Sequence, residues 1–190
     1  MRIVAGKHRG RNITAPQGLD IRPTTDRVRE SVFNILEHRD WGKDGMSIFA
    51  DVRVLDTFCG TGACGLEALS RGAAHVTFLD KSNTALDLCR QTIRILKEEV
   101  RTDLLRADCV RPPRPAEQYS LIFMDPPYGE NLAGTALENL LQSGWIEHNA
   151  ICVIETGTNE TLDTGHEFSL MEERTYGATR ISFIKHTTED

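Results

Sequence analysis

Short apolar runs alternate with amphipathic segments through most of the chain. Strands are expected at 52–56, 75–80, 102–107, 121–125 and 151–155. Helices are expected near 63–71 and 134–143, and a third between them has its apolar stripe at Ala85, Leu88, Cys89, Ile93 and Leu96. Repeated strand–helix units predict a parallel sheet covered by helices on both faces. The fold class is therefore α/β.

The two ends of the chain show other patterns. The first twenty residues alternate loosely around Gly6 and Gly10, which predicts a β-hairpin with a basic polar side. After Pro23, a Thr or Asp cap opens an amphipathic helix, and the stretch 40–51 has the composition of a linker. The end of the chain predicts two antiparallel strands around the turn YGAT. We divide the sequence into a basic hairpin and helix (1–40) and a core (41–190). The apolar positions of the N-terminal helix are Val28, Val32, Ile35 and Leu36.

Composition narrows the class of protein. At 190 residues, 39% hydrophobic and 26% charged, the chain fits one globular domain. No apolar run approaches the roughly 18 residues that span a bilayer, and the basic N-terminus lacks the apolar core of a signal peptide. A cytoplasmic protein is expected. Five cysteines without a CxxC pair and six scattered histidines indicate neither a disulfide framework nor a metal site.

The charge is unevenly distributed. The net charge is −6, but residues 1–30 hold seven Lys and Arg against three Asp and Glu, a balance of +4. The remaining 160 residues hold 15 bases and 25 acids, a balance of −10. A basic arm on an acidic body is typical of a protein that binds a polyanion. A solvated pair of surface strands explains the charge equally well.

A glycine-rich loop follows the first core strand. Gly60, Gly62 and Gly65 have the G-x-G-x-x-G spacing between a strand and a helix, and Asp80 ends the next strand. Glycines let the backbone approach a ligand closely, and an acid at this place accepts ribose hydroxyls. The pattern indicates a nucleoside-containing cofactor; a glycine-rich turn without a ligand is the alternative.

Two further acids indicate which cofactor. Asp56 at the strand end would oppose a pyrophosphate but suits a ligand with a cationic end, such as S-adenosylmethionine (SAM). Asp108, after the third strand, is placed to accept the adenine amine. A cap of its own loop is an equally good interpretation of Asp108.

The stretch LIFMDPPYGE, residues 121–130, ends a buried strand with an acid, two prolines and a tyrosine. Asp125 and the carbonyl of Pro126 form two acceptors held rigidly, because Pro126 and Pro127 fix φ. Two such acceptors suit a planar amine, and Tyr128 would stack on a flipped base. The alternative is a rigid turn that carries a surface tyrosine.

Three blocks together resemble a known family. RPTTDRVRESVFNIL, LDTFCGTGACGLEALSRGA and DPPY are similar to the bacterial small-subunit ribosomal RNA guanine-N2 methyltransferases of the RsmD type, over nearly the whole chain. The resemblance implies a class I SAM-dependent methyltransferase (Rossmann-like) with a mixed seven-stranded sheet, the seventh strand inserted antiparallel. It also implies transfer to the N2 amine of one guanine in 16S rRNA, within a partly assembled small subunit. We expect a monomer.

The family's roles carry over to matching positions. Asp56, Gly60 and Gly62 would lie under the methionine part of SAM, Asp80 at the ribose and Asp108 at the adenine, with their neighbours Phe58, Lys81 and Cys109 in the same site. Asp125, Pro126, Pro127 and Tyr128 would hold the guanine. The basic hairpin and the region from Arg22 to Arg29 would face RNA, with contacts from Lys7, Arg9, Arg11, Arg22 and Arg27.

Two positions depart from the family's pattern, and three other functions stay open. Many members have Phe in place of Tyr128, and Cys59 and Cys64 are interpreted as packing residues. Direct in-line transfer needs no covalent enzyme intermediate. An adenine-N6 methyltransferase would use the same DPPY loop, and a protein-glutamine methyltransferase typically has Asn in place of Asp125. An NAD(P)-dependent oxidoreductase leaves Asp56 and DPPY unexplained, and a non-catalytic RNA-binding module predicts no SAM affinity.

Overall fold

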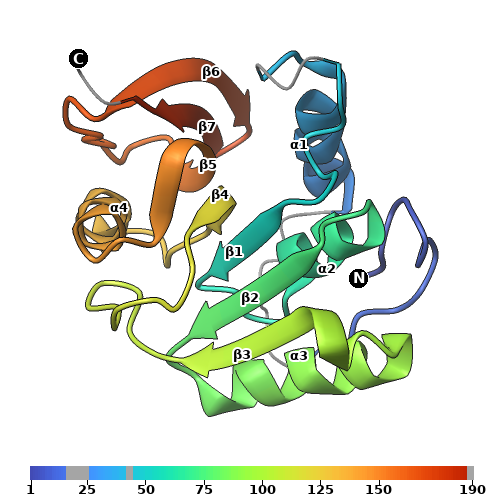
Figure 1. Ribbon diagram of the computed structural model, residues 1–190. Coiled ribbons are helices and arrows are strands. Elements are labelled where there is room, and N and C mark those ends of the chain that lie inside the picture. The colour runs from blue at the N-terminus through green and yellow to red at the C-terminus, as the bar shows by residue number, and fades with distance from the viewer. Residues whose placement is uncertain (16–25, 42–44, 188–190) are drawn as a thin grey trace.

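The computed structural model describes residues 1–15, 26–41 and 45–187. Seven strands form one sheet in the order β3-β2-β1-β4-β5-β7-β6 (Figure 1). Strands β1 to β5 are parallel, and β7 runs antiparallel between β5 and β6. The predicted mixed sheet is confirmed. The strands are β1 (Arg53–Thr57), β2 (His75–Asp80), β3 (Thr102–Arg106), β4 (Tyr119–Met124), β5 (Ile146–Gly157), β6 (Phe168–Tyr176) and β7 (Thr179–His186).

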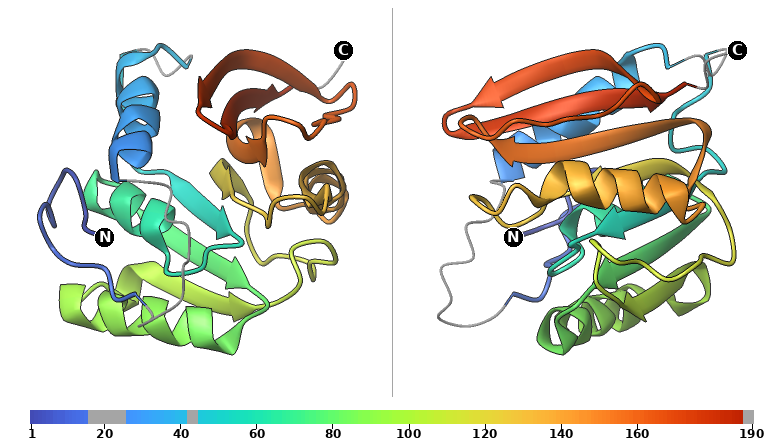
Figure 2. Two further views of the ribbon diagram at one scale, coloured as in Figure 1. Left: turned by 180° about the vertical axis from the view of Figure 1, so that it is seen from behind. Right: turned by 90° about the vertical axis from the view of Figure 1, so that its left-hand side faces the viewer.

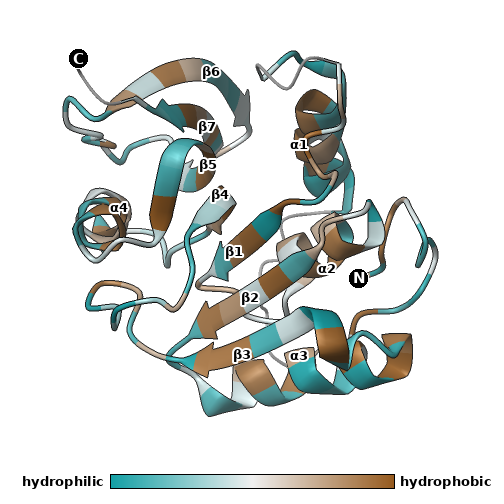
Figure 3. Ribbon diagram, in the orientation of Figure 1, coloured by the Kyte–Doolittle hydropathy of each residue, from teal (hydrophilic) through white to brown (hydrophobic). Residues whose placement is uncertain are grey.

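Helices cover both faces of the sheet (Figures 1 and 2). Alternate residues of each strand face opposite layers, so Phe123 packs with one core and Ile122 with the other. The first core includes residues of α1, α2 and α3, and the second includes those of α4. In Figure 3, α3 alternates brown and teal along its turns, as a helix with one apolar face should. The helices are α1 (Asp26–His38), α2 (Ala63–Ser70), α3 (Asn83–Leu96), the short 3₁₀ helix η1 (Glu99–Arg101) and α4 (Leu132–Gln142).

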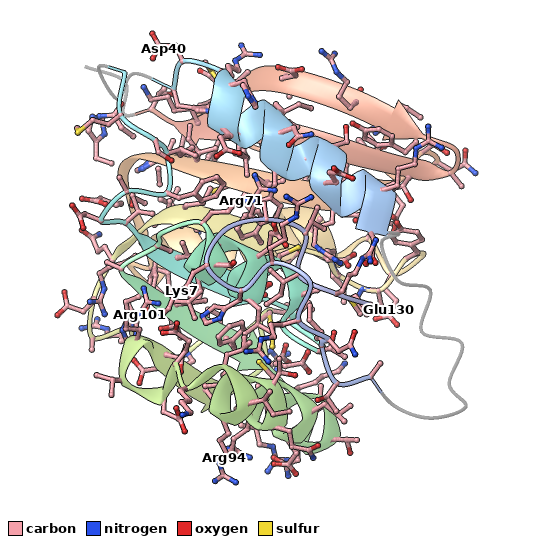
Figure 4. All side chains as sticks on the ribbon, turned by 90° about the vertical axis from the view of Figure 1, so that its right-hand side faces the viewer. Lys7, Asp40, Arg71, Arg94, Arg101 and Glu130 are labelled. Carbon is pink, nitrogen blue, oxygen red and sulfur yellow. The ribbon has the colours of Figure 1, made fainter. Side chains whose placement is uncertain are left out.

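The predicted N-terminal hairpin is present, but without regular strands. The described arm has one isolated antiparallel bridge, between Arg2 and Asn12, and the Ile3 N–H donates to the Arg11 carbonyl at 2.9 Å. The backbone N–H groups of Val4 and Ala5 donate to the buried carboxylate of Glu67 on α2. These two bonds hold the hairpin against the core (Figure 4).

The predicted linker at 40–51 is also corrected. Its described part has neither helix nor strand, but Trp41, Ile48 and Phe49 are buried. Phe33 of α1 stacks on Phe49 with ring centroids 5.4 Å apart and on Phe123 of β4 at 5.2 Å. The stretch is therefore part of the core that seats α1 on the sheet. The Thr cap expected after Pro23 lies outside the described residues. Within the described chain, no helix is long and apolar enough to cross a membrane.

Candidate active site

A cleft of about 530 Å³ lies where the loops after β1, β2, β3 and β4 meet. Parallel strands place their carboxyl ends at one edge of the sheet, so these loops converge there. The cleft brings together eleven of the twelve residues predicted for cofactor and amine, all except Gly62. They are Asp56, Phe58, Gly60, Asp80, Lys81, Asp108, Cys109, Asp125, Pro126, Pro127 and Tyr128.

The glycine loop has two glycines with different tasks. Gly60 has φ +54°, and a Cβ there would meet no atom within 4 Å, so this side of the loop faces open space. Gly62 has φ +78°, and a Cβ there would lie 2.5 Å from Cys89 Sγ and 3.0 Å from Phe78 Cε1. Gly62 therefore lies behind the cleft wall, where it lets the start of α2 pack against β2 and α3. Its predicted contact with the methionine end stays a prediction.

Gly62→Ala is expected to lower the free energy of unfolding by about 2–4 kcal/mol, from the positive φ together with overpacking against Cys89 and Phe78. Urea unfolding followed by circular dichroism measures it. Gly60→Ala is the matched control, because it has the same backbone strain without the clash and should lose about 1–2 kcal/mol. Equal losses in the two variants would contradict the packing role of Gly62.

Asp56 is the most buried acid of the cleft, at 4% exposed. Its Oδ2 accepts a hydrogen bond from the Gly65 N–H at 2.7 Å. Burial raises the pKa of Asp56 to about 8, with a further increase from nearby Asp80, against the lowering effect of the Gly65 N–H. The free protein thus holds this carboxyl protonated at neutral pH. A cationic ligand would favour the ionised form and displace the proton.

The next two acids accept hydrogen bonds from the backbone of the loops around the cleft. Asp80 accepts from the Gly60 N–H at 2.9 Å and, through its other oxygen, from the Ser82 N–H at 2.8 Å. Asp108 accepts from the Val110 N–H at 2.9 Å, so the loop cap considered from the sequence exists, and Asp108 lines the cleft as well. These bonds fix where the remaining acceptor positions of both carboxylates point.

The cysteines that line the cleft occupy packing positions, with Cys59 and Cys109 buried and Cys64 half-buried. Cys109 Sγ accepts from the Phe58 N–H at 3.2 Å, and burial raises the pKa of this thiol to about 12. Burial also raises the pKa values of Cys59 and Cys64 well above the usual thiol range. Thiols that stay protonated are poor nucleophiles, which agrees with their interpretation as packing residues.

The DPPY loop begins directly after β4. Asp125 is exposed, Pro126 is buried, and Tyr128 is 37% exposed. The Tyr128 hydroxyl donates to the carboxylate of Glu155 on β5 and lies 2.9 Å from the Thr179 Oγ1 on β7. Burial and the Glu155 bond raise the pKa of Tyr128, so the phenol keeps its proton. Neither partner was predicted, although Glu155 ends the run ICVIE as Asp125 ends LIFMD.

A second unpredicted residue is Arg29 of α1, which is 1% exposed and lines the cleft. The prediction that the whole region from Arg22 to Arg29 faces RNA is therefore wrong at Arg29. The helical spacing contains the signal, since Arg29 lies three and seven residues before the buried Val32 and Leu36. The positive charge of Arg29 favoured a surface position instead, because arginine is usually a surface residue.

Comparison with known proteins identifies the family. The sequence profile described as "Conserved hypothetical protein 95" matches residues 1–185. The ribosomal RNA small subunit methyltransferase D of Haemophilus influenzae is 33% identical, over 93% of this chain and 89% of its own length. The Escherichia coli protein of the same name is 30% identical, over 86% of this chain and 78% of its own. The chain belongs to the RsmD methyltransferase family.

Solved structures agree on the fold. The Escherichia coli protein yhhF matches with a TM-score of 0.83 and 26% identity, over 100% of this chain and 99% of its own. The more distant 16S rRNA methylase RmtB, 20% identical, shares the fold with a TM-score of 0.58, over 83% of this chain and 61% of its own. The class I methyltransferase fold is confirmed, and so is SAM as the cofactor of this RsmD family member.

Of the residues predicted to bind RNA, the four that the structure describes lie outside the cleft of the RsmD fold. Arg9, Arg11 and Arg27 are exposed, and Arg27 lines a surface groove between α1 and β6. Lys7 is exposed but pairs with buried Glu98 at 2.8 Å, beside Arg101 (Figure 4). Arg22 lies outside the described residues. In the described ranges, no group of three His, Cys, Asp or Glu side chains is arranged to hold a metal ion.

Proposed function

We propose that this protein transfers a methyl group from SAM to the exocyclic N2 amine of one guanine in 16S rRNA. It would act in the cytoplasm as a monomer on a partly assembled small subunit. The observation that supports this most is the shared cleft, in which Asp125–Tyr128 stand beside the acids of the cofactor site. The names of the related proteins support ribosomal RNA of the small subunit as the substrate.

The acids of the cleft fit the chemistry of SAM group by group. Asp56 suits the ammonium of the methionine end, Asp80 the ribose hydroxyls and Asp108 the adenine amine. SAM supplies an activated methyl group on a sulfonium. The remaining tasks, which are to orient the acceptor and exclude water, belong to the DPPY loop.

Asp125 and the Pro126 carbonyl would each accept one N–H of the guanine amine. An exocyclic amine is a weak nucleophile, because its lone pair is delocalised into the ring. Holding both hydrogens favours a pyramidal nitrogen and points the lone pair at the methyl group. The amine proton becomes acidic as the new C–N bond forms, and Asp125 is the nearest proposed acceptor for it. Positioning and electrostatics provide the rate enhancement.

Tyr128 provides the surface on which the base rests. Stacking of a base on an aromatic ring contributes about 1–3 kcal/mol, comparable with the cost of unstacking a nucleotide. The hydroxyl's bonds to Glu155 and Thr179 tie the ring to β5 and β7. A phenylalanine ring would stack equally well but would lack this attachment.

The proposal is tested with labelled SAM and small-subunit RNA that lacks its native methylations, offered free and as assembled subunits. Digestion to nucleosides and mass analysis should give label in N2-methylguanosine. Label in N6-methyladenosine would keep the site but replace the substrate. SAM binding without label in either nucleoside would contradict both. A comparison of free RNA with subunits shows which form is modified.

Arg9→Ala combined with Arg11→Ala is expected to weaken RNA binding and flatten its salt dependence. Each lost phosphate contact lowers the slope of log K against log salt by about 0.7–0.9, so two contacts remove about 1.5. Filter binding at several salt concentrations measures the slope. Arg94→Ala, on the outward side of α3 (Figure 4), is the control and should leave the slope unchanged. An unchanged slope in the double variant would remove the arm from the interface.

A further inference from the structure

The guanidinium of Arg29 is buried yet incompletely bonded. Its Nη2 donates to the Arg2 carbonyl at 2.6 Å and to Asp26 Oδ1 at 2.8 Å. Within the described residues, its Nε and Nη1 are buried and have no hydrogen-bond partner. These two atoms carry three N–H donors. Buried donors of a charged group are costly to leave unbonded, so an acceptor is expected at this place.

Arg29 lies at the inner end of the active-site cleft. Besides the cleft, it lines a small adjoining cavity of about 30 Å³ together with Asp56, Asp125 and Glu155. At 1% exposed, it is out of reach of a nucleic-acid backbone on the protein surface. The missing acceptor is therefore a small group that enters through the cleft.

The charge of the surroundings restricts that group further. The acidic side chains that line the cleft outnumber its cationic side chains, Arg29 and Lys81. Lys81 is exposed in the loop after β2, on the side of the ribose-binding Asp80, whereas Arg29 shares the inner cavity with Asp56. An anion that enters this acidic cleft thus has one buried cation near Asp56 to bind. The acids that line the cleft are Asp56, Asp80, Asp108, Asp125 and Glu155.

We propose that Arg29 binds the carboxylate of the methionine end of SAM through its unbonded Nε and Nη1 donors. The methionine end is a zwitterion, so a site that accepts it needs an acid for the ammonium and a base for the carboxylate. Asp56 and Arg29 supply this pair from β1 and α1. The inference rests on the proposed function only in taking SAM as the methyl donor.

The test compares SAM with decarboxylated SAM, which keeps the adenosine, sulfonium and ammonium. The analogue carries one more net positive charge than SAM, so an acidic cleft without a carboxylate receptor should bind it at least as tightly. With Arg29 in this role, calorimetry should show that the native protein binds SAM about 10- to 100-fold more tightly, the value of a hydrogen-bonded charge pair. Arg29→Gln should abolish the preference, and Arg94→Gln should keep it.

The test uses the ratio of the affinities for SAM and for decarboxylated SAM, and a partial folding defect lowers both affinities equally. Arg29 also holds Arg2 and Asp26, so Arg29→Gln loses some stability, but both ligands are measured on one preparation. The native protein alone provides a second arm that needs no variant. Equal or tighter binding of the analogue by the native protein, or an unchanged preference in Arg29→Gln, would overturn the inference. Native protein that binds neither ligand would overturn the proposed function as well, whereas RNA methylation without an Arg29-dependent preference would overturn this inference alone.

Discussion

Asp125→Asn is expected to lower the rate of methyl transfer by about 10²- to 10³-fold, the usual effect of removing one preorganised polar group from a reacting centre. Asparagine keeps the shape of the side chain but can direct an NH₂ donor at the amine that the carboxylate should accept. Asp125 is exposed in the cleft, so the fold should tolerate the change. Single-turnover transfer to small-subunit RNA measures the rate, and calorimetry should show SAM affinity within a few-fold of native.

Tyr128→Phe is the matched control for Asp125→Asn. It removes the hydroxyl's bonds to Glu155 and Thr179 but keeps the ring, so transfer should fall far less. The two variants together separate the amine acceptor from the stacking surface. A native rate in Asp125→Asn would end the amine-holding role, and an equal loss of SAM affinity would assign Asp125 to the cofactor instead.

Asp56→Asn is expected to bind SAM about 10²- to 10³-fold more weakly at pH 7, because removing one partner of a buried charge pair costs about 3–5 kcal/mol. The pH dependence is the sharper signature. With its pKa at about 8 in the free protein, Asp56 must lose a proton when it binds the ammonium. Native affinity should therefore rise about tenfold from pH 6 to pH 7, where the ligand's amine is still charged.

Calorimetry in buffers of different ionisation heat should show release of about one proton per SAM near pH 6.5, and none in Asp56→Asn. The variant's affinity should be flat over the same range. A flat native profile would contradict the assignment of Asp56 to the ammonium. Stability has the opposite trend: because the pKa is raised from 3.8 in the unfolded chain, the contribution of Asp56 to stability is present below pH 4 and lost as the pH rises to about 8.

The βα core was predictable because its signals are local. The strand at His75–Asp80 has the predicted bounds, and the others shift by a few residues. β5 is the largest exception. It begins at Ile146, which pairs with Tyr119 of β4, and the polar residues 147–150 fall in the irregular step before the regular pairing resumes at Ile151. The N-terminal hairpin divides in the same way. Its own backbone pairing follows from the local alternation and the turn glycines, whereas the bonds from Val4 and Ala5 to Glu67 join residues far apart in the sequence and could not be predicted from a local pattern.

The residues of the candidate site also separate into those that the sequence could predict and those that it could not. Residues that end strands were predictable, because parallel strands bring their carboxyl ends to one edge. Arg29 and Thr179 come from α1 and β7, far from these ends in sequence, and only the packing of α1 and the insertion of β7 bring them to the cleft. Gly62 shows the converse, since a motif position can serve packing rather than contact with a ligand.

The position of β7 between β5 and β6 has a consequence for the synthesis of the protein. A chain emerging from the ribosome can pair β1 to β5 in turn, but one edge of β5 stays open until residues 179–186 have been made. That edge follows the apolar run of Ile151 to Ile154, the kind of segment that pairs readily with another chain. Until β7 is made, the partly folded sheet therefore exposes an edge that can aggregate. Pairing of β7 with β5 covers this edge and also brings Thr179 to the hydroxyl of Tyr128, so the same folding step protects the sheet and completes the active site.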